Sequence, residues 1–174
     1  MRGKQSLKIV FDHPLSRVAG PVVVAALLVA GCAKAPVIEP PPPPVSVVVE
    51  VEATADVNPD VEGRASPVTV RVYRLADDAS FAKAEFFPLW DQESATLAAT
   101  AIGQHELRLA PGARDEVAFE LDPKVRSIGI ATAYRDFRSA AWKTSVAIPE
   151  QPAPGSTIRL LVSVQGRAVA ARWQ

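Results

Sequence analysis

Apolar and polar residues alternate with a period of two in a series of short segments that begins at Val45. The first two segments, 45–53 and 68–75, carry valines at every second position. Successive side chains of a β-strand point to opposite faces, so this pattern predicts strands that bury one face. Six further segments are expected to form strands: 104–109, 116–121, 127–134, 142–148, 157–164 and 167–173.

Turn residues separate several of these segments, including Pro111-Gly112, Asp122-Pro123 and Gln165-Gly166. About eight short strands separated by such turns favour a β-sandwich, because a parallel α/β sheet needs helical crossovers between its strands. The sequence therefore predicts an all-β fold with two antiparallel sheets.

One region after the second predicted strand has helical periodicity. A helix is expected to start near Asp78, with Phe81, Ala84 and Phe87 on one face, and Pro88 is expected to end it. The rest of the region, to residue 100, would form a second short helix or an irregular segment. Its aromatic residues are expected to pack this small helical insertion onto one end of the sandwich, with an exposed protein-binding or carbohydrate-stacking patch as the alternative.

The first 31 residues have the three parts of a secretory signal: a basic front, a short apolar middle, and small residues ahead of a cleavage site. The apolar run is too short to span a bilayer, which takes about 20 residues. The segment Val29-Ala30-Gly31-Cys32 resembles the bacterial lipobox, which implies cleavage before Cys32 and attachment of a diacylglycerol to its thiol. Several acyl chains anchor a protein stably. An ordinary signal peptide with a chance cysteine is the alternative.

Three parts of the chain follow from these patterns. Residues 1–31 are expected to be a lipoprotein signal peptide, and residues 32–44 the acylated cysteine with a proline-rich linker. The run from Pro40 to Pro44 favours an extended polyproline II path without backbone hydrogen bonds. Residues 45–174 are expected to form one periplasmic β-sandwich domain.

Composition excludes several classes of function. The chain has 19 basic and 19 acidic residues, and without its first 31 residues it is slightly acidic, unlike a typical nucleic-acid-binding protein. Cys32 is the only cysteine, and His105 is the only histidine beyond the signal, so a zinc site of Cys and His ligands is excluded.

A catalytic constellation is not apparent either. His105 alternates with Leu107 and Leu109 and is expected to be a half-buried strand residue. The sequence has no Gly-x-Ser-x-Gly motif. We therefore expect no enzyme, no cofactor and no metal site, and a degenerate hydrolase with His105 as its base is a rival interpretation.

The segment 54–67, between the first two predicted strands, is long for a hairpin loop. Three acidic residues and one arginine give it a net charge of −2. Long loops often carry function, so this one is the leading candidate for a partner-contact site. The proposed contact residues are Asn58, Asp60, Glu62 and Arg64.

Four features together resemble TssJ, the outer-membrane lipoprotein family of the type VI secretion system. They are the lipobox at Cys32, Asn58-Pro59 followed by the segment 63–75, the aromatic segment 84–91, and the segment 130–136 with Trp142-Lys143 after it. The resemblance implies a transthyretin-like β-sandwich with a small helical insertion. It also implies a lipid-anchored position at the inner leaflet of the outer membrane, facing the periplasm.

The resemblance further implies a partner. TssJ-like proteins bind the periplasmic carboxy-terminal domain of TssM, an inner-membrane protein, within a hetero-oligomeric ring complex. In that family the loop joining the first two strands is a contact element, which corresponds here to residues 55–67. The alternative is a periplasmic small-molecule or glycan-binding lipoprotein of transthyretin-like fold, in which Trp90 and Trp142 would line a pocket.

Overall fold

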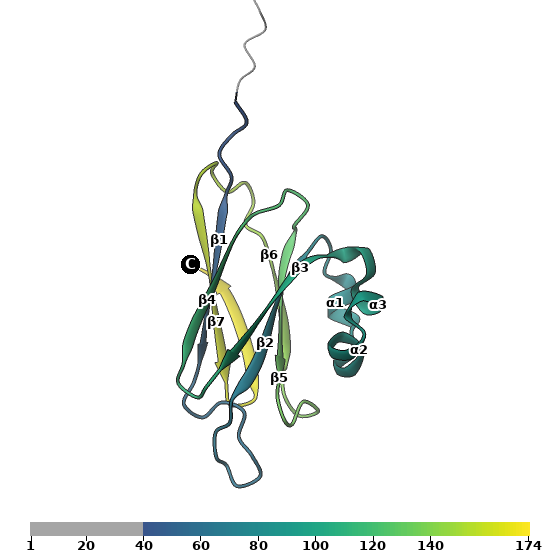
Figure 1. The fold of residues 1–174 in the computed structure, drawn as a ribbon, viewed down its shortest axis with the longest axis vertical. Helices are drawn as coiled ribbons and strands as arrows, with labels where there is room; N and C mark the ends of the chain where they lie inside the picture. Colours follow the sequence, from purple (N-terminus) through teal and green to yellow (C-terminus); the bar gives the residue numbers. More distant parts are fainter. Residues whose placement is uncertain (1–39) are drawn as a thin grey trace, which may run out of the picture. The chain divides into compact units, whose positions relative to one another are not determined.

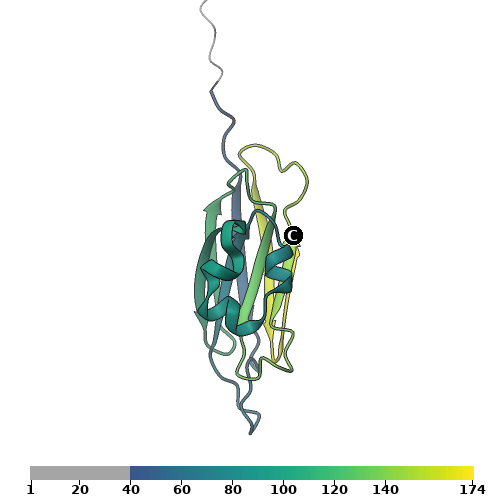
Figure 2. The same ribbon diagram turned by 90° about the vertical axis from the view of Figure 1, so that its right-hand side faces the viewer.

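The computed structural model describes residues 40–174, which form two four-stranded β-sheets with short helices on one outer face (Figures 1 and 2). The signal segment and Cys32 lie outside the described residues. The strands are β1 (Ser46–Ala53), β2 (Val68–Leu75), β3 (Ala101–Leu109), β4 (Arg114–Glu120), β5 (Ser127–Ala133), β6 (Lys143–Ala147), β7 (Thr157–Gln165) and β8 (Ala168–Trp173).

The first sheet has the strand order β4-β1-β7-β8, and the second has the order β3-β2-β5-β6. The predicted all-β sandwich is confirmed. One pairing differs from a purely antiparallel arrangement, because β1 and β7 run parallel. These two strands are not joined by a hairpin, so no turn fixes their relative direction, and the sequence pattern carried no signal of their pairing.

The core lies between the two sheets and consists of the residues that the alternation placed inward. Val47, Val49 and Val51 of β1 are at most 1% exposed, and Val70 and Val72 of β2 are fully buried. Removing such side chains from water is the main stabilising contribution to a sandwich, at about 1.5–3 kcal/mol for each fully buried side chain. The buried faces of β1 and β2 therefore match their predictions.

The helical insertion contains α1 (Ala79–Lys83), α2 (Phe86–Asp91), α3 (Glu93–Leu97) and a 3₁₀ turn (Ala98–Thr100). The prediction that Pro88 ends a first helix near Phe87 was wrong. The first helix stops at Lys83, and Pro88 lies in the first turn of α2. A proline is tolerated there, because the N–H groups of the first turn have no partner within the helix.

The insertion covers the outer face of the β3-β2-β5-β6 sheet rather than one end of the sandwich (Figures 1 and 2). A second apolar cluster holds it there and is formed by Tyr73, Leu75, Phe81, Leu89, Leu97 and Ala131. Tyr73 and Leu75 point away from the main core, because they alternate with the inward valines of β2. The prediction that the aromatic residues pack the insertion onto the sandwich was correct, but the predicted surface, one end of the sandwich, was wrong.

The last residues before β1 are tied to the sandwich. The Gly155 N–H donates to the Pro43 carbonyl oxygen (3.1 Å), so the expected absence of backbone hydrogen bonds in the linker fails at Pro43. Gly155 has a positive φ of 74° at this contact. The described chain enters at one end of the sandwich, and β1 leads to the opposite end, where the 54–67 loop projects (Figure 1).

Candidate partner-contact site

Four connections meet at the end of the sandwich opposite Pro40, which we call the loop end. They are the 54–67 loop, the β3–β4 turn at 110–113, the β5–β6 connection at 134–142 and the β7–β8 turn at 166–167. They lie together because β1, β3, β5 and β7 all finish there. Among them, the 54–67 loop extends farthest from the strands (Figure 1).

The base of the 54–67 loop is organised by Asn58. The Asn58 N–H donates to the Gly166 carbonyl oxygen (2.9 Å), and Nδ2 donates to the Pro67 carbonyl oxygen (2.8 Å). Oδ1 accepts from the Arg135 N–H (2.7 Å). Asn58 is 7% exposed and has a positive φ of 50°, a conformation that asparagine tolerates better than most residues. Through its backbone and side chain together, Asn58 thus joins the loop to the β5–β6 connection and the β7–β8 turn, and it is not on the loop surface.

The tip of the loop, residues 60–64, is organised by Asp60. Its Oδ1 accepts from the N–H groups of Glu62 and Arg64, both at 2.9 Å, and Oδ2 pairs with Arg64 Nε at 2.9 Å. These contacts lower the pKa of Asp60, chiefly through the hydrogen bond from the Arg64 backbone. Gly63, with a φ of 80°, completes the turn. Asp60 therefore shapes the tip as well as contributing to its surface.

The surface of the tip combines one apolar residue with a pair of charges. Val61 is fully exposed (101%), and the Arg64 Nη2 atom lies 3.3 Å from the Glu62 carboxylate. Burial of an exposed valine against a partner is favourable, so Val61 is a candidate apolar contact at the projecting tip. Sequence reasoning missed Val61, because one apolar residue in a charged loop has no periodicity. The only indication in the sequence was the position of Val61 between Asp60 and Glu62, shortly before Gly63.

The other connections of the loop end brace one another. The Tyr134 hydroxyl donates to the Gln165 carbonyl oxygen (3.0 Å), and burial raises the pKa of Tyr134. Asp136 accepts from Ser139 and lies 3.5 Å from Arg167 Nη1. Asp136 thus closes its own turn through Ser139 and joins the β5–β6 connection to the β7–β8 turn through Arg167.

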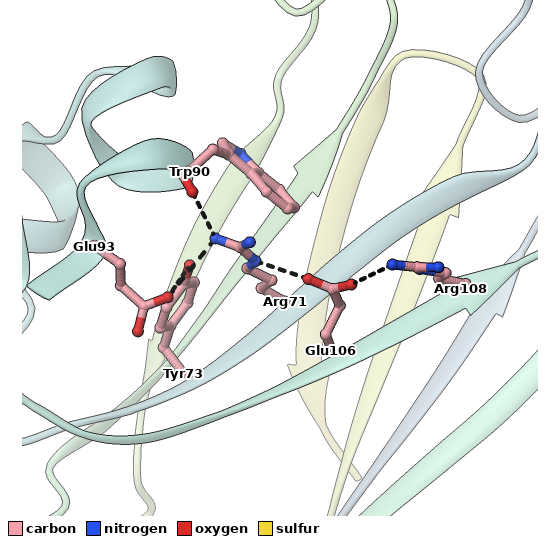
Figure 3. Close-up of polar contacts among 6 residues, drawn as sticks. All are labelled: Arg71, Tyr73, Trp90, Glu93, Glu106 and Arg108. Atoms are coloured by element: carbon pink, nitrogen blue, oxygen red, sulfur yellow. Dashed lines mark hydrogen bonds and ion pairs between the residues drawn. The ribbon is translucent and has the colours of Figure 1, made fainter.

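A polar network fixes the helical insertion to β2 and β3 (Figure 3). Arg71 donates from Nη1 to the Trp90 carbonyl oxygen (3.2 Å) and from Nε to Glu106 (3.1 Å), and its guanidinium lies 4.2 Å from the centre of the Trp90 ring. Glu106 also pairs with Arg108 at 3.2 Å, and Glu93 lies 3.7 Å from Arg71. The partly buried Arg71 side chain thus links α2 and α3 to the sheet.

The protonation of this network suits a structural role. Burial raises the pKa of Tyr73 to about 12, so its hydroxyl stays protonated at neutral pH. Contact with Arg71 lowers the pKa of Glu106, which keeps that carboxylate charged. Both groups hold one charge state across the physiological range, as a static clamp requires, whereas a general acid or base needs a pKa near the working pH.

The residues of the rival interpretations are engaged in packing. His105 is half-buried on β3, as expected, and stacks on Phe119 with ring centres 6.0 Å apart. Trp90 lies under Arg71, and Trp142 packs edge-on against Phe86 at 5.2 Å. Within residues 40–174, no three His, Cys, Asp or Glu side chains are grouped closely enough to hold a metal ion. In the same range, no helix has the length and apolar character that a membrane crossing needs.

A family model described as "Type VI secretion lipoprotein, VasD, EvfM, TssJ" matches residues 45–166, which contain the helical insertion and every strand except β8. The chain belongs to the TssJ family. The matched range includes the 54–67 loop, the β3–β4 turn and the β5–β6 connection. None of the curated proteins compared with the chain matches it.

Solved structures agree with membership of the TssJ family. The T6SS lipoprotein TssJ1 from Pseudomonas aeruginosa is 30% identical, with a TM-score of 0.69 over 76% of this chain and 98% of that one. Serratia marcescens Lip, described as a membrane-bound component of the type VI secretion system, is 21% identical, with a TM-score of 0.68 over 75% and 98%. A chain of the structure described as the T6SS protein TssM C-terminal domain from EAEC is 22% identical, with a TM-score of 0.58 over 73% and 97%.

Proposed function

We propose that this TssJ-family lipoprotein binds the periplasmic domain of a TssM-like inner-membrane protein through its loop end. In this proposal, acylated Cys32 holds the protein at the inner leaflet of the outer membrane. The function is positional: the sandwich is a rigid base, and the 54–67 loop is the recognition element. The chain belongs to a family of type VI secretion lipoproteins, and no evidence of catalysis supports an enzymatic function.

The preformed tip of the 54–67 loop is the observation that carries this proposal. Three hydrogen bonds to one Asp60 carboxylate define its shape, and Asn58 fixes its base to two neighbouring connections. A loop that is already ordered loses little conformational entropy when a partner binds it. The exposed Val61 supplies an apolar contact, and Glu62 with Arg64 supplies a polar rim.

The position of the loop supports the same assignment. The described chain joins β1 at Val45, and the 54–67 loop lies at the other end of that strand (Figure 1). A tether that enters at Val45 leaves the loop end unobstructed by its own attachment point. This arrangement suits a protein that is anchored at one membrane and contacts a partner that extends from the other.

The test is a pull-down from detergent-solubilised envelopes with the Cys32-anchored protein as bait. Residues 55–67 are replaced by a short Gly-Ser turn in one variant. In a matched control, Pro123 and Lys124, exposed at the opposite end of the sandwich, are replaced by Gly and Ser. The unaltered protein and the control are expected to recover a large inner-membrane protein of the TssM type, and the loop variant is not.

Two outcomes separate the parts of the proposal. Failure of the unaltered protein to recover any TssM-like protein would contradict the assigned function. Equal recovery by the loop variant would leave the function standing and would remove the 54–67 loop as the contact element.

A further inference from the structure

Only two large apolar side chains are exposed among residues 40–174: Val61 at the loop tip and Phe87 on α2. Phe87 is 55% exposed although it belongs to the helical insertion, whose other large apolar residues are at least partly covered. Its ring packs edge-on against Phe137 of the β5–β6 connection, with centres 5.0 Å apart. Phe87 therefore lies where the insertion meets the loop end.

Phe86, the neighbour of Phe87, forms the inner part of this cluster. Its ring stacks on Phe137 at 4.3 Å and packs edge-on against Trp142 at 5.2 Å and against Phe87 at 5.5 Å. The contacts with Phe137 and Trp142 pack α2 against the sandwich through Phe86, whereas Phe87 stays largely exposed. The outward surface of Phe87 contributes little to the core and is held in a fixed orientation by two rings.

One arginine borders the aromatic rings, and a second lies in the same connection. The Arg138 guanidinium lies 5.6 Å from the centre of the Phe137 ring, and Arg135, two residues before Phe137, is exposed. Within the described part of the chain, neither side chain forms an ion pair, whereas Arg64, Arg71 and Arg167 each do. Unpaired arginine beside exposed aromatic surface is the composition that favours protein contacts.

This surface adjoins the 54–67 loop. The Arg135 N–H donates to Asn58 Oδ1 at 2.7 Å, and the Arg135 charge contributes to the lowered pKa of Asp60. The β5–β6 connection that carries Phe137 is thus directly bonded to the base of the recognition loop. A partner seated on the loop tip would extend naturally onto Phe87.

We infer that Phe87, Phe137 and Arg138, here called the aromatic patch, are a second contact surface for the same partner. The inference rests on the proposed function and extends the interface from the loop onto the helical insertion. The partner surface it fits is apolar and edged by carboxylates. Phe87 and Phe137 would bury apolar area, and Arg138 would pair with an acidic group.

The test uses the acylated protein in detergent and the purified periplasmic domain of the TssM-like protein from the same organism. Affinity is measured by titration for the unaltered protein and for Phe87→Ala and Arg138→Glu. Arg172→Glu is the matched control, because Arg172 is exposed on the outer face of the other sheet and makes no ion pair among the described residues. Thermal unfolding confirms that each variant is folded.

Phe87→Ala and Arg138→Glu are each expected to weaken binding about ten-fold or more, as a residue near a hot spot does. The Arg172→Glu protein should bind as the unaltered protein does. Binding by Arg138→Glu should also weaken less with added salt than binding by the unaltered protein, because an exposed attraction has been replaced by a repulsion that salt screens.

The possible failures are distinct. Unchanged affinity of both variants, together with loss of binding on replacement of residues 55–67, would overturn the aromatic patch and keep the proposed function. Absence of binding by the unaltered protein would remove both. Self-association that disappears in Phe87→Ala, with unchanged partner affinity, would assign the patch to a second copy of this chain and would also overturn the inference.

Discussion

Asn58 shows how one residue connects the sequence of this protein to its proposed role. Its polarity made it a candidate contact residue, but the structure places its amide between Pro67 and Arg135. The sequence cannot distinguish a surface asparagine from a buried one, because both occur in polar loops. A positive φ and long-range backbone partners, which only the fold reveals, make Asn58 a positioning residue.

Replacement of Asn58 tests this role. Asn58→Ala is expected to lower the free energy of unfolding by about 1–3 kcal/mol, since it leaves buried backbone groups without partners. Asn58→Gly should lose less, because glycine adopts the positive φ without strain. Urea denaturation of both variants measures the difference. A change within about 0.5 kcal/mol for Asn58→Ala, as at an ordinary surface site, would contradict the role.

Tyr73 provides a prediction for alkaline pH. Burial raises its pKa from 10 to about 12 in the folded protein. The unfolded chain then loses this proton first, so the stability that the neutral hydroxyl provides is full below pH 10 and falls as the pH rises towards 12. Denaturation at several pH values in this range should show the fall. The slope should be smaller in Tyr73→Phe, with the remainder due to Tyr134, whose pKa is also raised; an unchanged slope would show that Tyr73 does not contribute.

At the scale of helices and strands, features set by local interactions could be predicted from the sequence, and features set by long-range contacts could not. The strands were readable because alternation is local, and their bounds differ from the predictions by only a few residues. The parallel pairing of β1 with β7 joins segments about a hundred residues apart, and nothing in either strand encodes it. The helical insertion was misread at Pro88, which can equally end one helix or lie in the first turn of the next.

The insertion is also fastened by Lys143 of β6. Its ammonium group donates to the carbonyl oxygens of Phe81 (2.9 Å) and Ala82 (2.8 Å) in α1. Burial lowers the pKa of Lys143, but the group receives the carbonyl contacts that a cation favours at the end of a helix.

Lys143→Met is expected to destabilise the insertion more than the sandwich. The loss is about 1–2 kcal/mol, because hydrogen bonds to a charged donor are removed. Hydrogen exchange should quicken in α1 and α2 and stay unchanged in β1. Lys124→Met, at an exposed turn, is the control. Equal protection of α1 in both variants would show that Lys143 does not hold the insertion.

At the scale of the whole molecule, the sequence alone indicated the anchor, and the structure describes what the anchor would carry. The lipobox at Cys32 is a chemical motif that can be read directly, whereas the loop end is assembled from four connections distant in sequence. For that reason Val61 and Phe87 could not be recognised before the fold was known. In the proposed function, the protein is a tethered domain whose candidate contact surface lies at the end of β1 opposite Val45.

Separation of anchor from domain gives a further prediction. The Cys32→Ser protein should fold with unchanged thermal stability, because the core begins beyond Pro44. It should be lost from the outer-membrane fraction, and secretion should fail. Fractionation, thermal unfolding and a secretion assay measure these outcomes. A soluble Cys32→Ser protein that supports secretion fully would show that anchoring is not required.

The central claim, that the loop end binds a TssM-like partner, is tested most directly by calorimetric titration. The purified periplasmic domain of that partner is titrated into the acylated protein, with and without residues 55–67 replaced by a Gly-Ser turn. The account predicts saturable binding by the unaltered protein and none by the loop variant, with both proteins folded. Binding of equal affinity to the two proteins, or no binding to either, would contradict it.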